Sequence, residues 1–323
     1  MTLITRRSAL SGLATTLAAP ALAQSEWPSR PVTIIVPQAA GGTNDLIARL
    51  LADKLTDLLG QRFVVDNRVG AGGNIGQAAA SRAAPDGQTI MVTTSSSHVT
   101  NPGLYPNPGF DPLKDYAAIS MLARLPLVLC VHPSFPAQTT AELIKLAKER
   151  PGFYSYGSAG NGTLNHLVAE MLKSRAGVDI KHIPYRGVAA MLADLVGGHI
   201  PIGTANLPSV ISQLQGNAVR PLGVSTAQRA PIIPNVPPLA DVLPGFDAEL
   251  WVALFAVAGT PQPIITRLRE ATLRAIAMPD LREKFAQNGA EPITSTPEAL
   301  QAKVAADLVS WAEIIRSSGA RIE

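Results

Sequence analysis

Two segments of the chain place glycines and hydroxyl side chains where an apolar, strand-like run gives way to a helix-like one. The first, AAGGTND at residues 39–45, follows the apolar run 32–36. Glycines let a backbone approach a ligand closely, and the first N–H groups of a helix have no partner within it. The helix dipole makes such a site attractive to an anion, typically a carboxylate. In this segment Gly41 and Gly42 allow the turn and the close approach.

An ordinary tight turn with Asn44 or Asp45 as helix N-cap gives the same pattern, so this segment alone does not establish a binding site. The second segment, GSAGNGT at residues 157–163, also follows a strand-like run and precedes a helix-like one. Two donor-rich helix starts that face each other across a cleft would bind a ligand with one or two negative ends. The glycines and hydroxyls of this segment offer N–H and O–H donors, and Asn165 and His166 lie in the first turn of the following helix.

Other polar residues follow further strand-like runs. SSSHVTNP at residues 95–102 adds Ser95 and Asn101 as weaker candidates, although a solvated serine-rich loop fits this segment equally well. Arg186 could pair with a carboxylate through two parallel hydrogen bonds, but a surface arginine is the simpler interpretation.

The sequence offers little for catalysis. Ser158 with His166 suggests a serine hydrolase, yet residues 156–160 read YGSAG and lack the first glycine of the G-x-S-x-G turn. None of the five histidines pairs with another at metal-ligand spacing, and the single cysteine, Cys130, cannot form a thiolate cluster. GAGGNIG at residues 70–76 resembles a dinucleotide loop but lacks the glycine needed at position 75, which favours a helix-starting turn near the cleft. We therefore expect no catalytic residue, no cofactor and no metal.

The elements around these segments alternate between short apolar runs and amphipathic patterns, which predicts an α/β fold with mostly parallel sheets flanked by helices. The expected strands are residues 32–36, 62–65, 89–94, 125–131, 153–157, 180–183, 200–204, 220–225 and 250–257. The expected helices are residues 46–59, 74–82, 139–149, 164–175, 188–196, 261–277, 279–288 and 297–316.

Two such blocks joined by two crossings predict a two-lobed protein with a cleft at the carboxyl ends of its strands. The expected crossings lie near residues 122–125 and 225–229. This division assigns residues 24–124 and 228–323 to lobe I, and residues 125–227 to lobe II.

The N-terminus has the three parts of an export signal: Arg6 and Arg7, an apolar run, and an A-x-A site that ends at Ala23. The paired arginines also fit a twin-arginine signal, so the export route stays open. A membrane anchor is the alternative, but spanning a bilayer takes about 20 apolar residues, and this run is shorter and contains Pro20. We expect cleavage near Ala23 and a periplasmic protein of residues 24–323.

Cleavage removes two arginines from a chain whose formal charge is +3, which leaves it nearly neutral. No cluster of basic residues alternates with aromatic ones, so nucleic acid is not an expected partner. Cys130 lies in the apolar run LVLCV, which favours a buried strand residue over a reactive thiol.

The ordered set of segments resembles the receptors of tripartite tricarboxylate transporters, the Bug receptor family. It includes VPQAAGGTNDLIAR, DNRVGAGGNIGQAAA, YGSAGNGTLNHLVAEML and HIPYRGVAAMLADLVGGHI, and it spans nearly the whole mature chain. The resemblance implies a two-lobed periplasmic protein of the Venus-flytrap type. Such a protein captures a small carboxylate and presents it to integral-membrane permease subunits, and we expect it to be a monomer.

The resemblance implies that the ligand carboxylate contacts the family's AGGxxD loop, which here is Ala40, Gly41, Gly42, Thr43 and Asp45. On the other lobe the matching positions are Ser158, Gly160, Thr163 and His166, and the weaker candidates are Ser95, Asn101 and Asn206. Two departures concern the ligand. Gln38 replaces the usual phenylalanine or proline and places an amide at the pocket edge. Asn206 lies where relatives often carry an aspartate, which disfavours an amino group on the ligand. A secreted hydrolase and a ligand-sensing subunit of a signalling system remain the alternative functions.

Overall fold

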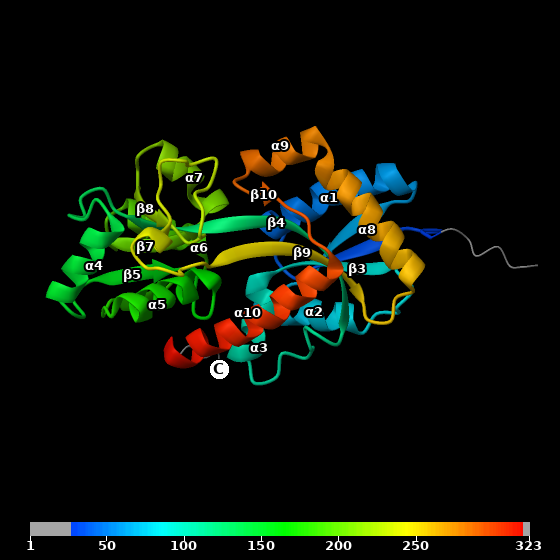
Figure 1. Ribbon diagram of the computed structural model, residues 1–323, viewed down its shortest axis with the longest axis horizontal. Helices are drawn as coiled ribbons and strands as arrows, with labels where there is room; N and C mark the ends of the chain where they lie inside the picture. Colours follow the sequence, from blue (N-terminus) through cyan, green and yellow to red (C-terminus); the bar gives the residue numbers. More distant parts are fainter. Residues whose placement is uncertain (1–26, 319–323) are drawn as a thin grey trace, which may run out of the picture.

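The computed structural model describes residues 27–318, so the predicted export signal at residues 1–23 lies outside the described residues. Two mixed sheets share one long strand, β4 (Tyr116–Val131). Its first part, Tyr116–Pro126, pairs with β9 (Glu249–Val257), and its second part, Leu127–Val131, lies between β7 and β8. The strands β4 and β9 therefore run along the long axis of the molecule and connect its two lobes (Figure 1).

The first sheet has the strand order β2-β1-β3-β9-β4-β10. β1, β2 and β3 are parallel, whereas β9 runs antiparallel to both of its neighbours. Besides β4 and β9, its strands are β1 (Val32–Val36), β2 (Phe63–Asn67), β3 (Thr89–Thr94) and β10 (Glu291–Pro292). The helices around it are α1 (Thr43–Leu59), η1 (Ala71–Gly73), α2 (Asn74–Ser81), η2 (Ser96–Thr100), α3 (Asn101–Leu104), α8 (Gln262–Ala277) and α9 (Pro279–Gln287). This sheet and its helices form the first lobe.

The second sheet has the order β8-β4-β7-β5-β6, in which β7, β5 and β6 are parallel and β4 is antiparallel to β7 and β8. Its further strands are β5 (Ser155–Ser158), β6 (Lys181–Pro184), β7 (Ile202–Asn206) and β8 (Arg220–Val224). Its helices are α4 (Thr140–Glu149), α5 (Leu164–Ala176), α6 (Val188–Val196) and α7 (Leu207–Gln215). These elements form the second lobe, and the two-lobed α/β prediction is confirmed.

Hydrophobic periodicity explains how the helices attach to the sheets. In α1, Ile47, Leu51 and Leu55 lie on one face and are fully buried against β1 and α8, in a cluster that includes Leu268. Gly60 ends this helix in the left-handed conformation, at φ 73°. Cys130 is buried in β4, as the sequence predicts, and burial raises the pKa of its thiol.

Besides short elements such as α3 and β10, which were not expected, two longer elements differ from the sequence-based expectation. β4 begins at Tyr116, well before the expected start at Leu125, and it continues through Pro126, which lies where the strand passes from the first sheet to the second. The helix α7 was not expected at all. Its second residue is Pro208, and a proline in the first turn costs no helical hydrogen bond, so this proline does not prevent a helix.

The chain returns from the second lobe to the first at Ala248, later than the predicted crossing near 225–229. Ala248 N–H donates to the carbonyl oxygen of Ser225 over 2.9 Å, directly before β9. Between these residues the chain packs on the second lobe, where Ala230 and Val236 share a core cluster with Val128. These contacts favour a lobe II that continues to about residue 248, while the lobe boundaries themselves stay a prediction.

The last helix, α10 (Pro297–Ser318), contacts α3 and η2 of the first lobe and α5 of the second. Asp307 of this helix accepts a 2.8 Å hydrogen bond from the indole N–H of Trp251 in β9. In Figure 1, α10 lies beside the two crossing strands, so it packs against the connection between the lobes. Among residues 27–318, no helix has the length and apolar character that crossing a membrane requires.

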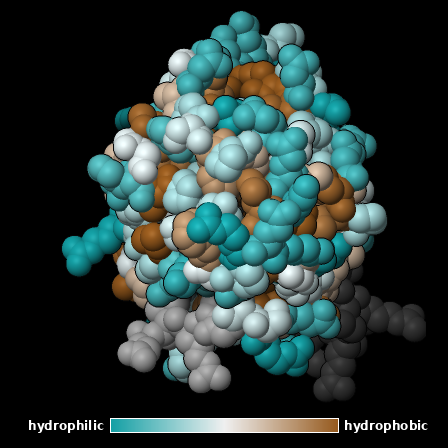
Figure 2. Space-filling view, turned by 90° about the vertical axis from the view of Figure 1, so that its left-hand side faces the viewer, coloured by the Kyte–Doolittle hydropathy of each residue, from teal (hydrophilic) through white to brown (hydrophobic). Residues whose placement is uncertain are grey.

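Figure 2 faces the end of the molecule that holds the second lobe. Hydrophilic residues cover most of this face, and hydrophobic residues appear between them in separate areas. The exposed large hydrophobic residues of this lobe belong to different elements, as Phe153 and Val196 do. Single exposed hydrophobic residues are common on globular proteins and need no partner.

Candidate functional site

A cavity of about 440 Å³ lies between the lobes and is lined by both of them. Leu127 of β4 and Leu250 of β9 line it from the crossing strands. The residues from the first lobe are Pro37, Gln38, Ala39, Gly42, Thr43, Asn44, Val69, Gly70, Gly72, Gly73, Thr94, Ser96 and Ser97. Those from the second lobe are Thr163, Leu164, Asn165 and Asn206. The volume falls within the 300–1,000 Å³ that is usual for small-molecule sites.

Four helices begin at this cavity. The N-cap residues of α1, α2, α5 and α7 are Gly42, Gly73, Thr163 and Asn206, and all four line it. Only Thr163 caps its helix with its side chain, by accepting a hydrogen bond from the N–H of His166. The other three helix starts have no side-chain cap, and the first N–H groups of α1 remain available to an anion. At α2 the N–H groups of Asn74 and Ile75 already donate to the carbonyl oxygens of Ala71 and Gly70, and at α7 the second residue, Pro208, has no N–H.

None of the residues that line the cavity is charged. The nearest carboxylate in the first segment, Asp45, is buried behind the loop. It accepts hydrogen bonds from Gly41 N–H at 2.9 Å, Arg49 Nε at 3.0 Å and Asn67 Nδ2 at 3.0 Å. Burial raises the pKa of Asp45, but these hydrogen bonds outweigh that effect and hold its pKa below the usual value. Asp45 therefore fixes the shape of the loop.

Gln38 joins the polar side chains of the first lobe. Its amide nitrogen donates to the hydroxyls of Ser97 and Thr94, and its amide oxygen accepts from Asn44 Nδ2. Asn44 Nδ2 also donates to the carbonyl oxygen of Val92 over 3.0 Å, which ties the start of α1 to β3. These side chains form hydrogen bonds with one another and so hold the ends of β1 and β3 together.

The glycine-rich segment 70–76 contributes Gly70, Gly72 and Gly73 to the cavity, in agreement with the expected helix-starting turn near the cleft. Gly73 has φ 105°, and a Cβ atom there would lie 2.9 Å from the hydroxyl of Ser97. Only glycine fits this conformation and this close approach. The segment therefore forms part of the cavity wall.

The second-lobe loop is held by two histidines. Ser158 Oγ lies 2.7 Å from His182 Nε2, and Gly162 N–H donates to His166 Nδ1 over 3.1 Å. The two imidazole rings stack with their centroids 4.0 Å apart. Burial lowers the pKa of both, that of His182 to about 3, so the stacked pair is neutral. The pairing of Ser158 with His166 that a hydrolase would need is wrong, because Ser158 is buried and bonded to His182 instead.

The structure brings four of the sequence-predicted residues to the cavity wall: Gly42, Thr43, Thr163 and Asn206. The other eight lie outside it or behind it: Ala40, Gly41, Asp45, Ser95, Asn101, Ser158, Gly160 and His166. Ser95 Oγ accepts from Trp251 N–H over 3.2 Å, and Asn101 Nδ2 donates to the carbonyl oxygen of Gly72 over 3.1 Å. These two side chains position the crossing strand and the glycine-rich loop. Whether any of the twelve contacts a ligand stays a prediction.

The sequence-based reasoning missed two kinds of lining residue. Polar ones such as Asn44, Ser96 and Asn165 stand at strand ends and helix starts, and this position was a usable signal. Leu127 and Leu250 lie inside apolar runs that predict only strands, so no local signal separates them from core residues.

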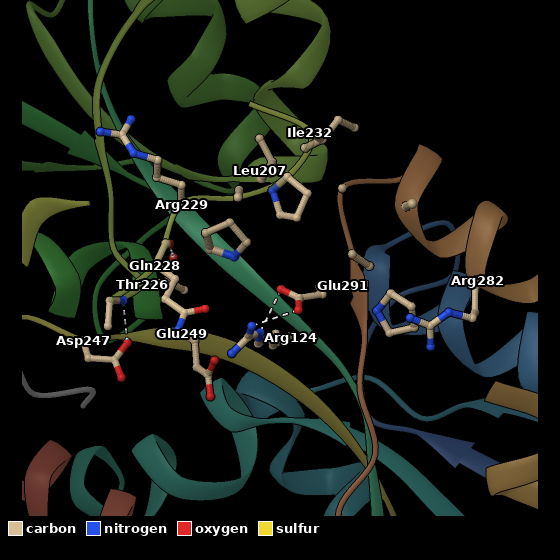
Figure 3. Close-up of a pocket in the computed structure, with 18 of the residues that line it drawn as sticks. Arg124, Leu207, Thr226, Gln228, Arg229, Ile232, Asp247, Glu249, Arg282 and Glu291 are labelled. Carbon is tan, nitrogen blue, oxygen red and sulfur yellow. Dashed lines mark hydrogen bonds and ion pairs between the residues drawn. The ribbon is translucent and has the colours of Figure 1, made fainter. Parts of the chain in front are cut away.

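A second and larger cavity, of about 650 Å³, lies between the loop at residues 226–232 and α9. Figure 3 shows its charged side chains, with Arg124 and Glu291 joined by two hydrogen bonds of 2.8 Å. Pro126 and Glu249 line this cavity, whereas their strand neighbours Leu127 and Leu250 line the first one. Consecutive strand residues point to opposite faces, so the two cavities receive alternate side chains of the crossing strands.

Comparison with known proteins identifies the family to which this architecture belongs. Residues 47–320 match the model of the tripartite tricarboxylate transporter family receptor, TctC. Protein BugT of Bordetella pertussis is 35% identical over 95% of this chain and 94% of its own length. A protein of Pseudomonas sp. strain P51, from the tcbD–tcbE intergenic region, is 36% identical over 97% of this chain and 94% of its own length.

Solved structures agree with this comparison. R. palustris Rpa4515, solved with adipate, has a TM-score of 0.81 and 36% identity and covers 92% of this chain and 100% of that one. MatC from Rhodopseudomonas palustris, solved with malate, has a TM-score of 0.77 and 29% identity, covering 89% and 99%. The periplasmic binding protein BugD has a TM-score of 0.77 and 33% identity, covering 92% and 100%. The chain belongs to the receptor family of the tripartite tricarboxylate transporters, which includes the Bug proteins.

Proposed function

We propose that this protein is a periplasmic receptor that captures a small organic carboxylate in the cavity between its lobes and delivers it to the integral-membrane permease subunits of a tripartite transporter. One observation in particular supports a carboxylate as the ligand. Four helices begin at the cavity, three of them without a side-chain cap, and no charged side chain lines it. An anion can therefore be held by backbone N–H groups and hydroxyls alone.

The relatives support the same class of ligand. Rpa4515 was solved with adipate and MatC with malate, both of them small carboxylates. Delivery to permease subunits, a periplasmic location after cleavage near Ala23, and a monomeric state follow from the family and from the N-terminal sequence. They are part of the proposal, as is the division into lobes at residues 124/125 and 227/228.

Closure of the lobes would bring the starts of α1 and α2 toward those of α5 and α7. A ligand that contacts both sides binds the closed form better than the open one, and this difference in affinity drives closure. The closed cavity would exclude water and strengthen each N–H contact with the carboxylate.

Two alternatives predict different results. A hydrolase would need a serine that a substrate can reach and a histidine of ordinary basicity, but Ser158 is fully buried and burial lowers the pKa of the neighbouring His182 to about 3. An esterase screen of the wild type and of Ser158→Ala tests this alternative, and we expect no activity that the substitution removes. A signalling subunit would keep the same ligand site, so binding alone does not separate signalling from transport. Uptake of a labelled carboxylate that the receptor binds, measured in cells with and without the receptor gene, separates these two roles.

The binding experiment is calorimetry on protein that has been unfolded and refolded to remove copurified ligand. The panel contains mono- and dicarboxylates, neutral sugars and cationic amines. We expect at least one carboxylate to bind with a micromolar or lower Kd, about −8 kcal/mol or better. Binding of sugars or amines with no carboxylate bound would contradict the proposal.

A further inference from the structure

Two exposed hydrophobic side chains of the first lobe belong to the segment that borders the cavity between the lobes. Val69, which follows β2, is 54% exposed although it lines this cavity. Ile75, in the first turn of α2, is 56% exposed and does not line it. A lining side chain that is more than half exposed lies where the cavity meets the solvent, so Val69 stands at the cavity mouth.

Gly70 connects these two side chains. A Cβ atom at Gly70 would lie 2.5 Å from Ile75 Cδ1, so the side chain of Ile75 lies against the backbone of Gly70. Gly70 itself lines the cavity, directly after Val69. The residues Val69, Gly70 and Ile75 therefore form one apolar rim on the first lobe. Other exposed hydrophobic residues, such as Leu113 and Val309, line neither of the two cavities.

Segment 159–163 of the second lobe reaches the same cavity through Thr163, which lines it. Hydrogen bonds fix the shape of this loop. Thr163 Oγ1 donates to the carbonyl oxygen of Gly160 over 2.7 Å, and Gly162 N–H donates to His166 Nδ1 over 3.1 Å. The apolar rim and a loop of fixed shape thus belong to the two sides of one cavity.

We infer that the apolar rim closes onto segment 159–163 when a carboxylate binds, and that the burial of Val69 and Ile75 stabilises the ligand-bound form. This inference rests on the proposed function and names side chains that drive closure of the lobes. Apolar side chains that leave water favour the closed form, and a more favourable closure lowers the apparent Kd. Ile75 thereby contributes to affinity without touching the ligand.

Cysteine reactivity tests this burial on the full mature chain. Ile75→Cys and its control Val309→Cys, at a side chain that is 64% exposed, each add one accessible thiol, because Cys130 is fully buried. The probes are a water-soluble maleimide and the carboxylate that binds most tightly in the calorimetry panel. We expect this carboxylate, at saturation, to slow the reaction of Ile75→Cys about five-fold or more and to leave that of Val309→Cys unchanged.

The outcomes separate this inference from the proposed function. Equal reactivity of Ile75→Cys with and without a carboxylate that the variant binds overturns the inference and leaves the proposed function standing. If no carboxylate of the panel binds to the wild type, the proposed function fails and the inference fails with it.

The affinity of Ile75→Thr is the second test, because threonine keeps the β-branch and makes the rim polar. Every carboxylate that binds should bind more weakly by one common factor, about three-fold or more, since Ile75 acts through closure. Val309→Thr is the matched control and should change neither affinity nor the thermal midpoint. Unchanged affinity in Ile75→Thr that circular dichroism shows to be folded overturns the inference. A loss that differs from one carboxylate to the next also overturns it, because it indicates direct contact with the ligand.

Discussion

The two cavities of this protein share the crossing strands β4 and β9 but differ in chemistry. The smaller one receives Leu127 and Leu250, lacks charged side chains and has four helix starts at its wall. The larger one receives Pro126 and Glu249 and is lined by Arg124, Arg229 and Arg282, of which Arg124 is paired with Glu291. In the proposed function the smaller cavity is the anion site, so size does not identify that site. In the larger cavity Arg124 pairs with a carboxylate of the same cavity, whereas in the smaller one no side chain caps the start of α1.

The largest expected effect tests the smaller cavity directly. Gly42→Val should raise the carboxylate Kd at least about 100-fold, because the side chain occupies the space in which the ligand meets the start of α1. The fold should survive, since Gly42 has an ordinary φ of −79° and a Cβ there meets only Ala39 O at 3.4 Å. Calorimetry and circular dichroism measure the two effects.

Gly197→Val is the control for this substitution. Gly197 also has an ordinary φ, −72°, and it lies at the end of α6 and outside both cavities. Unchanged affinity in Gly42→Val would mean that segment 39–45 is only a turn.

The substitution Asn206→Asp adds a negative charge, which should affect thermal stability and carboxylate affinity in opposite directions. Aspartate at the N-cap of α7 interacts well with the helix dipole, so the thermal midpoint should stay the same or rise. The same charge repels a carboxylate in a cavity without cations, and we expect the Kd to rise about ten-fold or more. Asn288→Asp, at the end of α9, controls for net charge. Tighter carboxylate binding in Asn206→Asp would contradict this assignment of the anion site.

A substitution in the larger cavity should instead lower stability and leave carboxylate affinity unchanged. Arg124→Gln removes the pair with Glu291, in which both side chains are about one-third exposed, and should cost about 1 kcal/mol of unfolding free energy. Carboxylate affinity should stay within about two-fold of the wild type, because Arg124 does not line the smaller cavity. Urea denaturation and calorimetry check the two values. Loss of carboxylate binding in this variant would move the anion site to the larger cavity.

The smallest expected effect concerns pH. No titratable side chain lines the smaller cavity, so carboxylate affinity should stay constant from pH 8 to about 5.5.

The stability of the fold should decrease as the pH falls over this range. His98 and His182 have folded pKa values lowered by burial to about 3, whereas the usual value is about 6.5. Their contribution is complete above pH 6.5 and is lost as the pH falls toward 3, because the unfolded chain binds the protons. Thermal melts and calorimetry over this range measure the difference, and affinity that falls together with the thermal midpoint would contradict the prediction.

The sequence predicts the fold better than the cavity wall, and the reason is physical. Apolar periodicity locates α1 and β1 because burial of one helix face or of a whole strand requires it. The same periodicity cannot show that Leu127 and Leu250 face a cavity, because core residues give an identical pattern. That Asp45 and His166 hold the loops also follows only from hydrogen bonds that the sequence does not encode locally.

The central claim is that backbone N–H groups at the helix starts of the smaller cavity hold a carboxylate. Selective ¹⁵N-glycine labelling tests it directly, because the chain has 26 glycines and both cavities contain at least one. The amide signals are followed during titration with the tightest carboxylate. We predict that the largest shifts occur at Gly42, Gly72 and Gly73, while Gly289 in the charged cavity stays nearly constant. Shifts confined to Gly289, with Gly42 and Gly73 unchanged, would contradict the account.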